Sequence, residues 1–223
     1  MKNVLETAEE AVRLPAGTVL LEGNLGVPQN ATGVVLFAHG SGSSRHSARN
    51  RAVAATFRQA GLGTLLFDLL SAEEEDMDAG TMLLRFDIAL LGTRLMCAVD
   101  WMGSRAEAKA LPMGLFGAST GAAAALVAAA RRPAVVRAVV SRGGRPDLAG
   151  GALASVQAPT LLIVGEQDAE VLALNRQAKQ ALRCENELEI VPGATHLFEE
   201  PGTLDKVAQL ARDWFLQKLG GKK

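Results

Sequence analysis

Apolar residues of this chain fall into short, uninterrupted runs, and between most of these runs they recur with helical spacing. Short apolar runs bounded by turn-forming residues are typical of strands that are buried on both faces of a sheet. The predicted strands of this kind are Val34–Ala38, Thr64–Phe67, Met113–Phe116, Val135–Val140, Pro159–Val164 and Leu188–Val191.

Segments with helical periodicity separate these strands. Residues 52–60 place several apolar side chains on one face, and Gly61 ends the pattern. Further helices are predicted over Thr81–Met102, Ala122–Ala130, Glu170–Leu182 and Thr203–Leu219. Strands that alternate with helices indicate one mostly parallel sheet covered by helices on both sides, which is a three-layer α/β/α sandwich.

Two other segments depart from this alternation. The pieces Ala11–Leu14 and Thr18–Asn24 are joined by a turn at Pro15-Ala16-Gly17, so they predict an antiparallel edge of the sheet. The acidic segment from Glu73 to Asp78 is interpreted as a solvated loop in preference to a cation site.

Composition narrows the class of protein. The chain has 223 residues, 48% of them hydrophobic, and we interpret residues 1–223 as a single domain. A net charge of −1 gives no reason to expect nucleic acid or an anionic membrane as partner, and no apolar run reaches the roughly 18 residues of a membrane helix. Residues 1–10 do not resemble a signal peptide, and Cys97 and Cys184 are expected to be free thiols, so a cytoplasmic location is expected.

The pentapeptide Gly117-Ala118-Ser119-Thr120-Gly121 lies between a predicted strand and a predicted helix. A G-x-S-x-G turn in this context places the serine hydroxyl at the carboxyl edge of the sheet, where ligands bind in open α/β folds. The two glycines let strand and helix approach each other without Cβ clashes. Ser119 is therefore the predicted nucleophile.

A serine hydroxyl needs a base to remove its proton, and the base needs a third group to orient it. His196, in the loop after the last predicted strand, is the predicted base. Asp168, which follows the strand Pro159–Val164, is the preferred third member, with Glu166 and Asp147 as alternatives. The order serine, acid, histidine is that of the α/β-hydrolases.

The tetrahedral oxyanion formed by serine attack needs hydrogen-bond donors. The backbone N–H of Thr120 and the backbone N–H of Ser41, in a loop rich in Gly and Ser, are the predicted donors. His39 is expected to brace this loop by hydrogen bonding, whereas His46 is expected either on the surface or lining the pocket.

Two arginines follow the strand Val135–Val140. Arg142 and Arg145, beside Gly143 and Gly144, could clamp a carboxylate or phosphate group of the substrate. The alternative is that one of them pairs with Asp147 or another acidic loop residue. No metal site and no organic cofactor are expected, because there is no C-x-x-C motif and no histidine pair at metal-ligand spacing.

With these motifs the chain resembles the α/β-hydrolases, and among them the dienelactone hydrolase family. The segments that carry the resemblance are His39-Gly40-Ser41-Gly42-Ser43, Gly117-Ala118-Ser119-Thr120-Gly121, Gly165-Glu166-Gln167-Asp168 and Gly193-Ala194-Thr195-His196. The resemblance implies an α/β-hydrolase fold of about eight strands and hydrolysis of an ester or lactone through an acyl-enzyme. Dienelactone hydrolases proper use a cysteine nucleophile, whereas this position holds Ser119, which points to a serine esterase on the same scaffold.

The short segment 141–158 leaves no room for the large cap that many related esterases insert there. We therefore expect an open site in which Ser119, His196 and Asp168 hydrolyse small carboxylic esters. A thioesterase, lactonase or amidase with the same triad is the alternative among enzymes, and a non-catalytic binding protein with this fold is the alternative outside them. The sequence does not indicate the oligomeric state.

Overall fold

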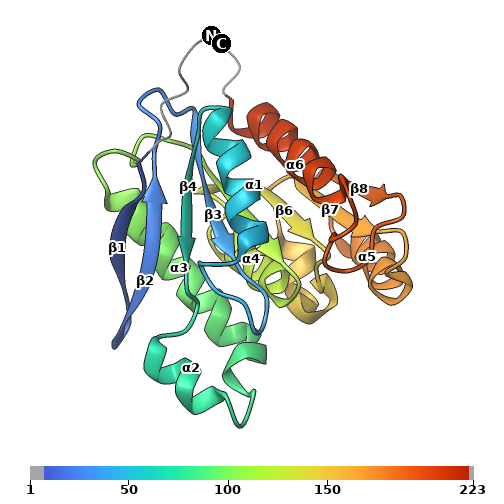
Figure 1. Ribbon diagram of the computed structural model, residues 1–223, viewed down its shortest axis with the longest axis horizontal. Coiled ribbons are helices and arrows are strands. Elements are labelled where there is room, and N and C mark those ends of the chain that lie inside the picture. Colours follow the sequence, from blue (N-terminus) through green and yellow to red (C-terminus); the bar gives the residue numbers. More distant parts are fainter. Residues whose placement is uncertain (1–7, 221–223) are drawn as a thin grey trace.

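Eight strands form one sheet with the order β1-β2-β4-β3-β5-β6-β7-β8 in the computed structural model, which describes residues 8–220 (Figure 1). The strands are β1 Glu10–Ala16, β2 Val19–Gly26, β3 Gly33–Ala38, β4 Leu62–Phe67, β5 Met113–Ala118, β6 Val136–Arg142, β7 Thr160–Gly165 and β8 Asn186–Val191. β2 pairs antiparallel with both β1 and β4, and the strands from β4 to β8 are parallel. The predicted antiparallel edge is thus confirmed.

Helices cover both faces of this sheet, as the alternating pattern predicted. They are α1 Ala48–Gln59, α2 Ala72–Asp78, α3 Ile88–Ser104, α4 Thr120–Arg131, α5 Ala169–Ala181 and α6 Thr203–Leu219, with 3-10 segments η1 Leu84–Phe86 and η2 Pro146–Ser155. Helices α1 and α6 pack together on one face, while α3 and α4 pack together on the other (Figure 1). Between β6 and β7 the chain forms only η2 and short turns, so no large cap is inserted there.

The sheet separates two apolar cores. Every residue of β3 is buried, and its side chains alternate between the layers: Val35 and Phe37 face α1 and α6, whereas Leu36 and Ala38 face α3 and α4. In the core between the sheet and helices α1 and α6, four aromatic rings pack together: Phe37, Phe57, Phe116 and Phe215. This double burial explains why the strands read as continuous apolar runs. No helix within residues 8–220 is long and apolar enough to cross a membrane.

The acidic segment 73–78 was expected to be a loop, and this expectation is wrong because the segment forms helix α2. Ser71 and Glu74 form a capping box, in which each side chain accepts a hydrogen bond from the other residue's backbone N–H. These bonds satisfy donors that are otherwise unpaired at the start of a helix, and acidic residues in the first turn favour its dipole.

Asp78, at the end of α2, has no solvent exposure. Burial alone would raise the pKa of Asp78, but hydrogen bonds from the Arg85 side chain, two backbone N–H groups and Thr81 lower it to about 2. The network shapes the turn that follows, so the helix predicted to begin at Thr81 begins at Ile88, with Asp87 as its N-cap.

Helix α4 approaches the end of β3 so closely that position 121 cannot carry a side chain. A Cβ atom on Gly121 would overlap the backbone carbonyl oxygens of Ala38 and His39. We predict that Gly121→Ala lowers the free energy of unfolding by at least about 1–3 kcal/mol, measured by urea denaturation. Gly151→Ala is the matched control and should be nearly neutral, because no atom lies within 4 Å of the added Cβ. Equal losses in both variants would contradict this account.

Candidate active site

Ser119 lies between β5 and α4 with backbone angles of φ 51° and ψ −122°. Positive φ is costly for a residue with a side chain and is found where the surrounding structure enforces it. Here the enforcement comes from close packing on both sides, since a Cβ on Gly117 would meet the backbone of Ala122, and one on Gly121 would meet that of Ala38. The turn presents the half-buried serine at the carboxyl edge of the sheet, as the motif predicted.

Asp168 and His196 come together from two other strand ends. The Nδ1 atom of His196 lies 2.6 Å from Oδ2 of Asp168, and the aspartate is the less exposed of the two. This contact selects the ring orientation in which Nδ1 faces the carboxylate and Nε2 is left to exchange protons.

The alternative acids are occupied elsewhere. Glu166 accepts a hydrogen bond from the backbone N–H of Gly193 at 2.8 Å, and Asp147 is paired with Arg145. Of the three carboxylates considered, Asp168 is the one whose side chain contacts His196.

Ser119 and His196 line the same cavity, which has a volume of about 600 Å³. Residues 40–44 and 46–49 form one wall, and Arg142 lines the cavity as well. No hydrogen bond joins Ser119 Oγ to His196 among the described residues, but such catalytic bonds often shorten only when substrate binds. The structure therefore brings the Ser119 hydroxyl and an imidazole held by Asp168 into one cavity.

The loop after β3 passes directly over Ser119. A Cβ atom on Gly40 would lie 2.9 Å from Ser119 Cβ, so this position requires glycine. The neighbouring backbone N–H of Ser41 donates to Thr120 Oγ1 at 2.9 Å. The predicted oxyanion donor at Ser41 thus already has an acceptor, because the Thr120 side chain projects from the first turn of α4 toward this loop. The backbone N–H of Thr120 itself lies at the first position of α4, where the helix supplies no acceptor.

His39 braces the same loop, as predicted. Its ring is 6% exposed; Nδ1 lies 3.0 Å from the carbonyl oxygen of Gly40, and Nε2 accepts from the backbone N–H of Leu69 at 3.0 Å. Burial lowers the pKa of His39, with the Gly40 bond and the charges of Asp68 and Glu75 acting against it. His46 is exposed and lines the cavity, so both placements considered for it hold.

The two predicted substrate-binding arginines separate in the structure. Arg145 forms a two-fold hydrogen-bonded ion pair with Asp147, at 2.9 and 2.8 Å, and is absent from the residues that line the cavity. For Arg145 the structure therefore supports the alternative, an internal ion pair. Arg142 does line the cavity and is 7% exposed. Arg49, which sequence reasoning missed, lines it as well, and the only signal for it was its place after the loop rich in Gly and Ser.

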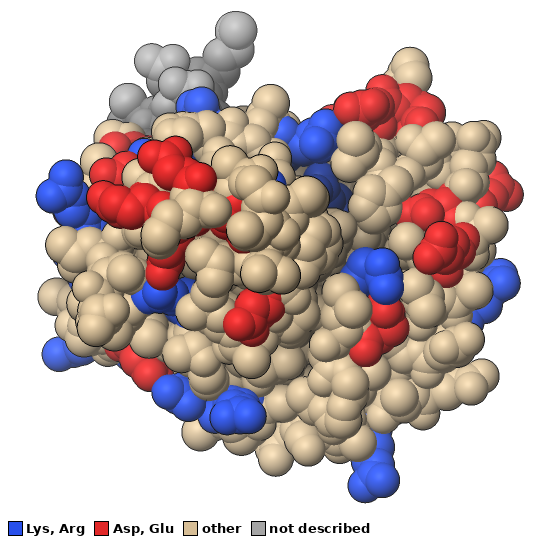
Figure 2. Space-filling view, turned by 90° about the horizontal axis from the view of Figure 1, so that it is seen from below, with Lys and Arg blue, Asp and Glu red and all other residues tan. Residues whose placement is uncertain are grey.

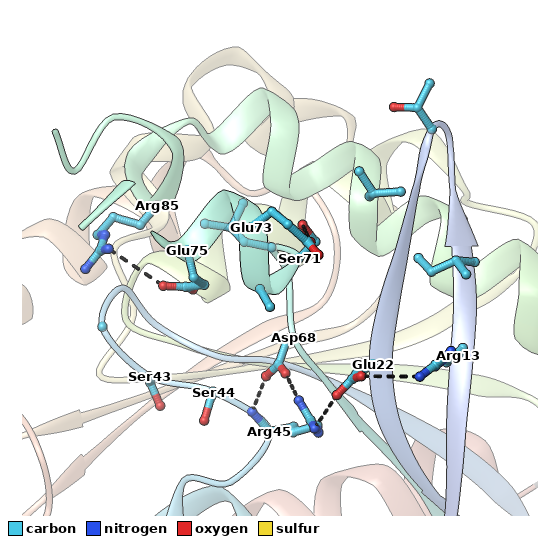
Figure 3. A pocket seen from close by; sticks show the side chains of 16 residues that line it. Arg13, Glu22, Ser43, Ser44, Arg45, Asp68, Ser71, Glu73, Glu75 and Arg85 are labelled. Atoms are coloured by element: carbon cyan, nitrogen blue, oxygen red, sulfur yellow. Dashed lines mark hydrogen bonds and ion pairs between the residues drawn. The ribbon is translucent and has the colours of Figure 1, made fainter. Parts of the chain in front are cut away.

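A second, larger cavity of about 900 Å³ is also lined by residues 42–44 (Figure 3). Each of its arginines contacts a carboxylate: Arg45 bonds to Asp68 and Glu22, Arg13 contacts Glu22, and Arg85 contacts Glu75. This cavity contains no serine–histidine pair among its lining residues. Within residues 8–220, no group of three or more His, Cys, Asp or Glu side chains is arranged to hold a metal ion.

The protein has an α/β-hydrolase fold. Its strand order is that of this fold, a strained serine turn follows β5, and the acid and the histidine follow β7 and β8. The sequence model of the dienelactone hydrolase family matches residues 21–218, and the chain belongs to this family of hydrolases. The resemblance inferred from the motifs is thereby confirmed.

The chain is similar to several individual proteins. The crystal structure of a dienelactone hydrolase from Anabaena variabilis is 58% identical, with a TM-score of 0.94 over 96% of this chain and 99% of that chain. Est1E from Butyrivibrio proteoclasticus shares the fold at 15% identity, with a TM-score of 0.79 over 95% of this chain and 99% of that chain. A Mycobacterium tuberculosis protein named "Putative phosphoribosyl transferase" is 57% identical over 96% of this chain. The chain spans only 47% of the length of that relative.

The hydrogen bond between Thr120 Oγ1 and the Ser41 N–H generates one prediction. Thr120→Val keeps the shape of the side chain but leaves the part-buried N–H without a partner, so it should lower the free energy of unfolding by about 1–3 kcal/mol in urea. Thr120→Ser retains the hydroxyl and should lose clearly less. Equal losses in the two variants would show that the hydroxyl does not hold the loop.

The buried His39 generates a prediction about pH. Because its pKa is lowered in the folded state, the unfolded chain takes up the proton first as the pH falls below about 6.5, and stability decreases there. His39→Gln offers an acceptor to Leu69 N–H but does not titrate. The loss of unfolding free energy between pH 7.5 and pH 5.0 should therefore be smaller in His39→Gln than in the original protein, measured by urea denaturation. The same loss in both proteins would refute the assignment.

Proposed function

We propose that this protein is a serine hydrolase that cleaves small carboxylic esters through an acyl-enzyme. The observation that carries the proposal is the 2.6 Å contact between Asp168 and His196 at a cavity that Ser119 also lines. Hydrolysis of an ester needs a nucleophile, a base of fixed orientation and donors for the oxyanion, and candidates for all three are present at this cavity.

In the first step, Ser119 Oγ attacks the ester carbonyl carbon while His196 Nε2 takes the hydroxyl proton. The Asp168 carboxylate stabilises the imidazolium that forms, and the imidazolium then gives its proton to the departing alkoxide, which leaves as an alcohol. In the second step, water replaces the alcohol: His196 takes a proton from water, the hydroxide attacks the acyl carbon, and Ser119 leaves with the proton returned.

The oxyanion of each tetrahedral intermediate faces the first turn of α4. The backbone N–H of Thr120 is the principal donor, since the helix offers it no acceptor. The N–H of Ser41 serves as second donor by sharing its hydrogen between Thr120 Oγ1 and the oxyanion. The hydroxyl of Thr120 thus acts as a positioning group that keeps this N–H beside the nucleophile.

The phosphoribosyl transferase name belongs to a protein of which this chain covers 47%. For the part that this chain represents, the cavity described above favours ester hydrolysis.

A cytoplasmic location belongs to the same proposal. Cys97 and Cys184 are both free thiols, which suits the reducing environment of the cytoplasm.

Removing the nucleophile tests the proposal. Ser119→Ala should lower kcat for p-nitrophenyl acetate on the order of 10⁴-fold or more, and it should prevent labelling by a fluorophosphonate probe. Its unfolding temperature should stay close to that of the original protein, because Ser119 lies on a turn outside both cores. A protein without any esterase activity or labelling would favour the non-catalytic alternative.

Replacing Asp168 tests its role, and replacing Asp147 in the same way is the matched control. Asp168→Asn should lower kcat by about 10⁴-fold, since the histidine loses its oriented tautomer. Asp147→Asn removes a carboxylate that contacts Arg145 and not His196, so it should retain most of the activity. Similar losses in the two variants would contradict the role assigned to Asp168.

A further inference from the structure

The cavity at Ser119 is lined by basic side chains without acidic ones. Arg49, Arg142, His46 and His196 are among its lining residues, and no Asp or Glu is. The neighbouring cavity of Figure 3 differs, because each of its arginines has a carboxylate partner, whereas Nε and Nη1 of Arg142 are buried without one. Figure 2 shows the molecule from below the view of Figure 1. Residues of both signs of charge are dispersed over this face. The excess of basic groups is therefore a local property of the nucleophile's cavity.

Arg142 carries the main part of this excess. It is 7% exposed, and its Nε and Nη1 atoms are buried without a hydrogen-bond partner. Burial, together with repulsion from Arg49, lowers the pKa of Arg142 to about 10, so the guanidinium stays charged at neutral pH. A buried charge without partner is costly, and proteins ordinarily pair such groups with an anion.

Arg49 and the start of α1 add to the same end of the cavity. The only partner of the Arg49 guanidinium among the described residues is Glu199 at 3.0 Å, and its Nε atom is buried and unpartnered. Helix α1 has 12 residues and no acidic side chain in its first turn. Its N-cap Ser47 and the preceding Ser44 accept backbone N–H bonds, which leaves their hydroxyl hydrogens to donate elsewhere. Helix N-termini of this kind favour bound anions.

From these observations we infer that the cavity binds a phosphate group of the substrate between Arg142, Arg49 and the N-terminus of α1. The substrate class is then a carboxylic ester that also carries a phosphate monoester, which deepens and rests on the proposed function. A phosphate monoester has a charge close to −2 and three acceptor oxygens, which matches two guanidinium groups and several hydroxyl donors better than a carboxylate does. A cavity of about 600 Å³ accommodates both the phosphate and the ester of a small molecule.

Binding of inorganic phosphate to Ser119→Ala protein tests the subsite independently of catalysis. Phosphate should raise the unfolding temperature and bind measurably by calorimetry, and adding Arg142→Gln should weaken binding at least about tenfold. Arg145→Gln is the matched control and should bind phosphate as before, because Arg145 pairs with Asp147 outside the cavity. Without phosphate, Arg142→Gln should unfold at the same or a higher temperature, since it removes an unpaired buried charge. Unchanged binding in Arg142→Gln, or equal binding of succinate and phosphate, would overturn the inference.

A pair of substrates tests the inferred substrate class. 1-Acetylglycerol 3-phosphate should be hydrolysed with a higher kcat/KM than 1-acetylglycerol, by about 10- to 100-fold, and Arg142→Gln should bring this ratio close to one. If Ser119→Ala protein binds phosphate but the original protein hydrolyses neither ester, the proposed function fails while the subsite stands. If both esters are hydrolysed equally and phosphate does not bind, the subsite fails while the hydrolase stands.

Discussion

The close approach of helix α4 to the end of β3 is the constraint on which the candidate site depends. With glycine at positions 117 and 121, the helix backbone lies against the carbonyl groups of Ala38 and His39. The chain between β5 and α4 then has so little room that Ser119 takes a positive φ. The strain at one residue is supported by two extensively buried apolar cores, which is how a folded protein maintains a local conformation that it would not adopt in isolation.

The same approach brings the loop after β3 into the site. Gly40 passes over Ser119, the Ser41 N–H reaches Thr120 Oγ1, and His39 ties the base of the loop to Leu69. These contacts join segments that are far apart in the sequence, so the loop is held by tertiary hydrogen bonds and not by a regular element. A loop held in this way needs little further ordering when a substrate binds, and preorganised donors are what the proposed oxyanion stabilisation requires.

Much of this arrangement could be predicted from the sequence, because burial on both faces leaves a strong pattern. The continuous apolar runs predicted the strands. The G-x-S-x-G turn, Asp168 and His196 were placed by their positions after β5, β7 and β8. The acidic composition of residues 73–78 predicted a loop, but the capping box of Ser71 and Glu74 stabilises helix α2 there. The different environments of Arg142 and Arg145 could not be read from sequence either, since pairing with Asp147 or burial in a cavity depends on side-chain directions in three dimensions.

The buried guanidinium of Arg142 affects both the stability of the free protein and the proposed preference for an anionic substrate. The free protein bears the cost of a charged group that has lost water without gaining a partner, and a bound anion would remove that cost. An ester without an anionic group would occupy the same cavity and leave the guanidinium unpaired. It would therefore bind more weakly than an anionic ester, because only the anionic ester offsets the cost of burying this charge. The cavity of Figure 3 lacks this property, because its arginines are neutralised by Asp68, Glu22 and Glu75 within the fold itself. Unpaired charge, more than cavity size, therefore distinguishes the candidate binding site from the larger hollow beside it.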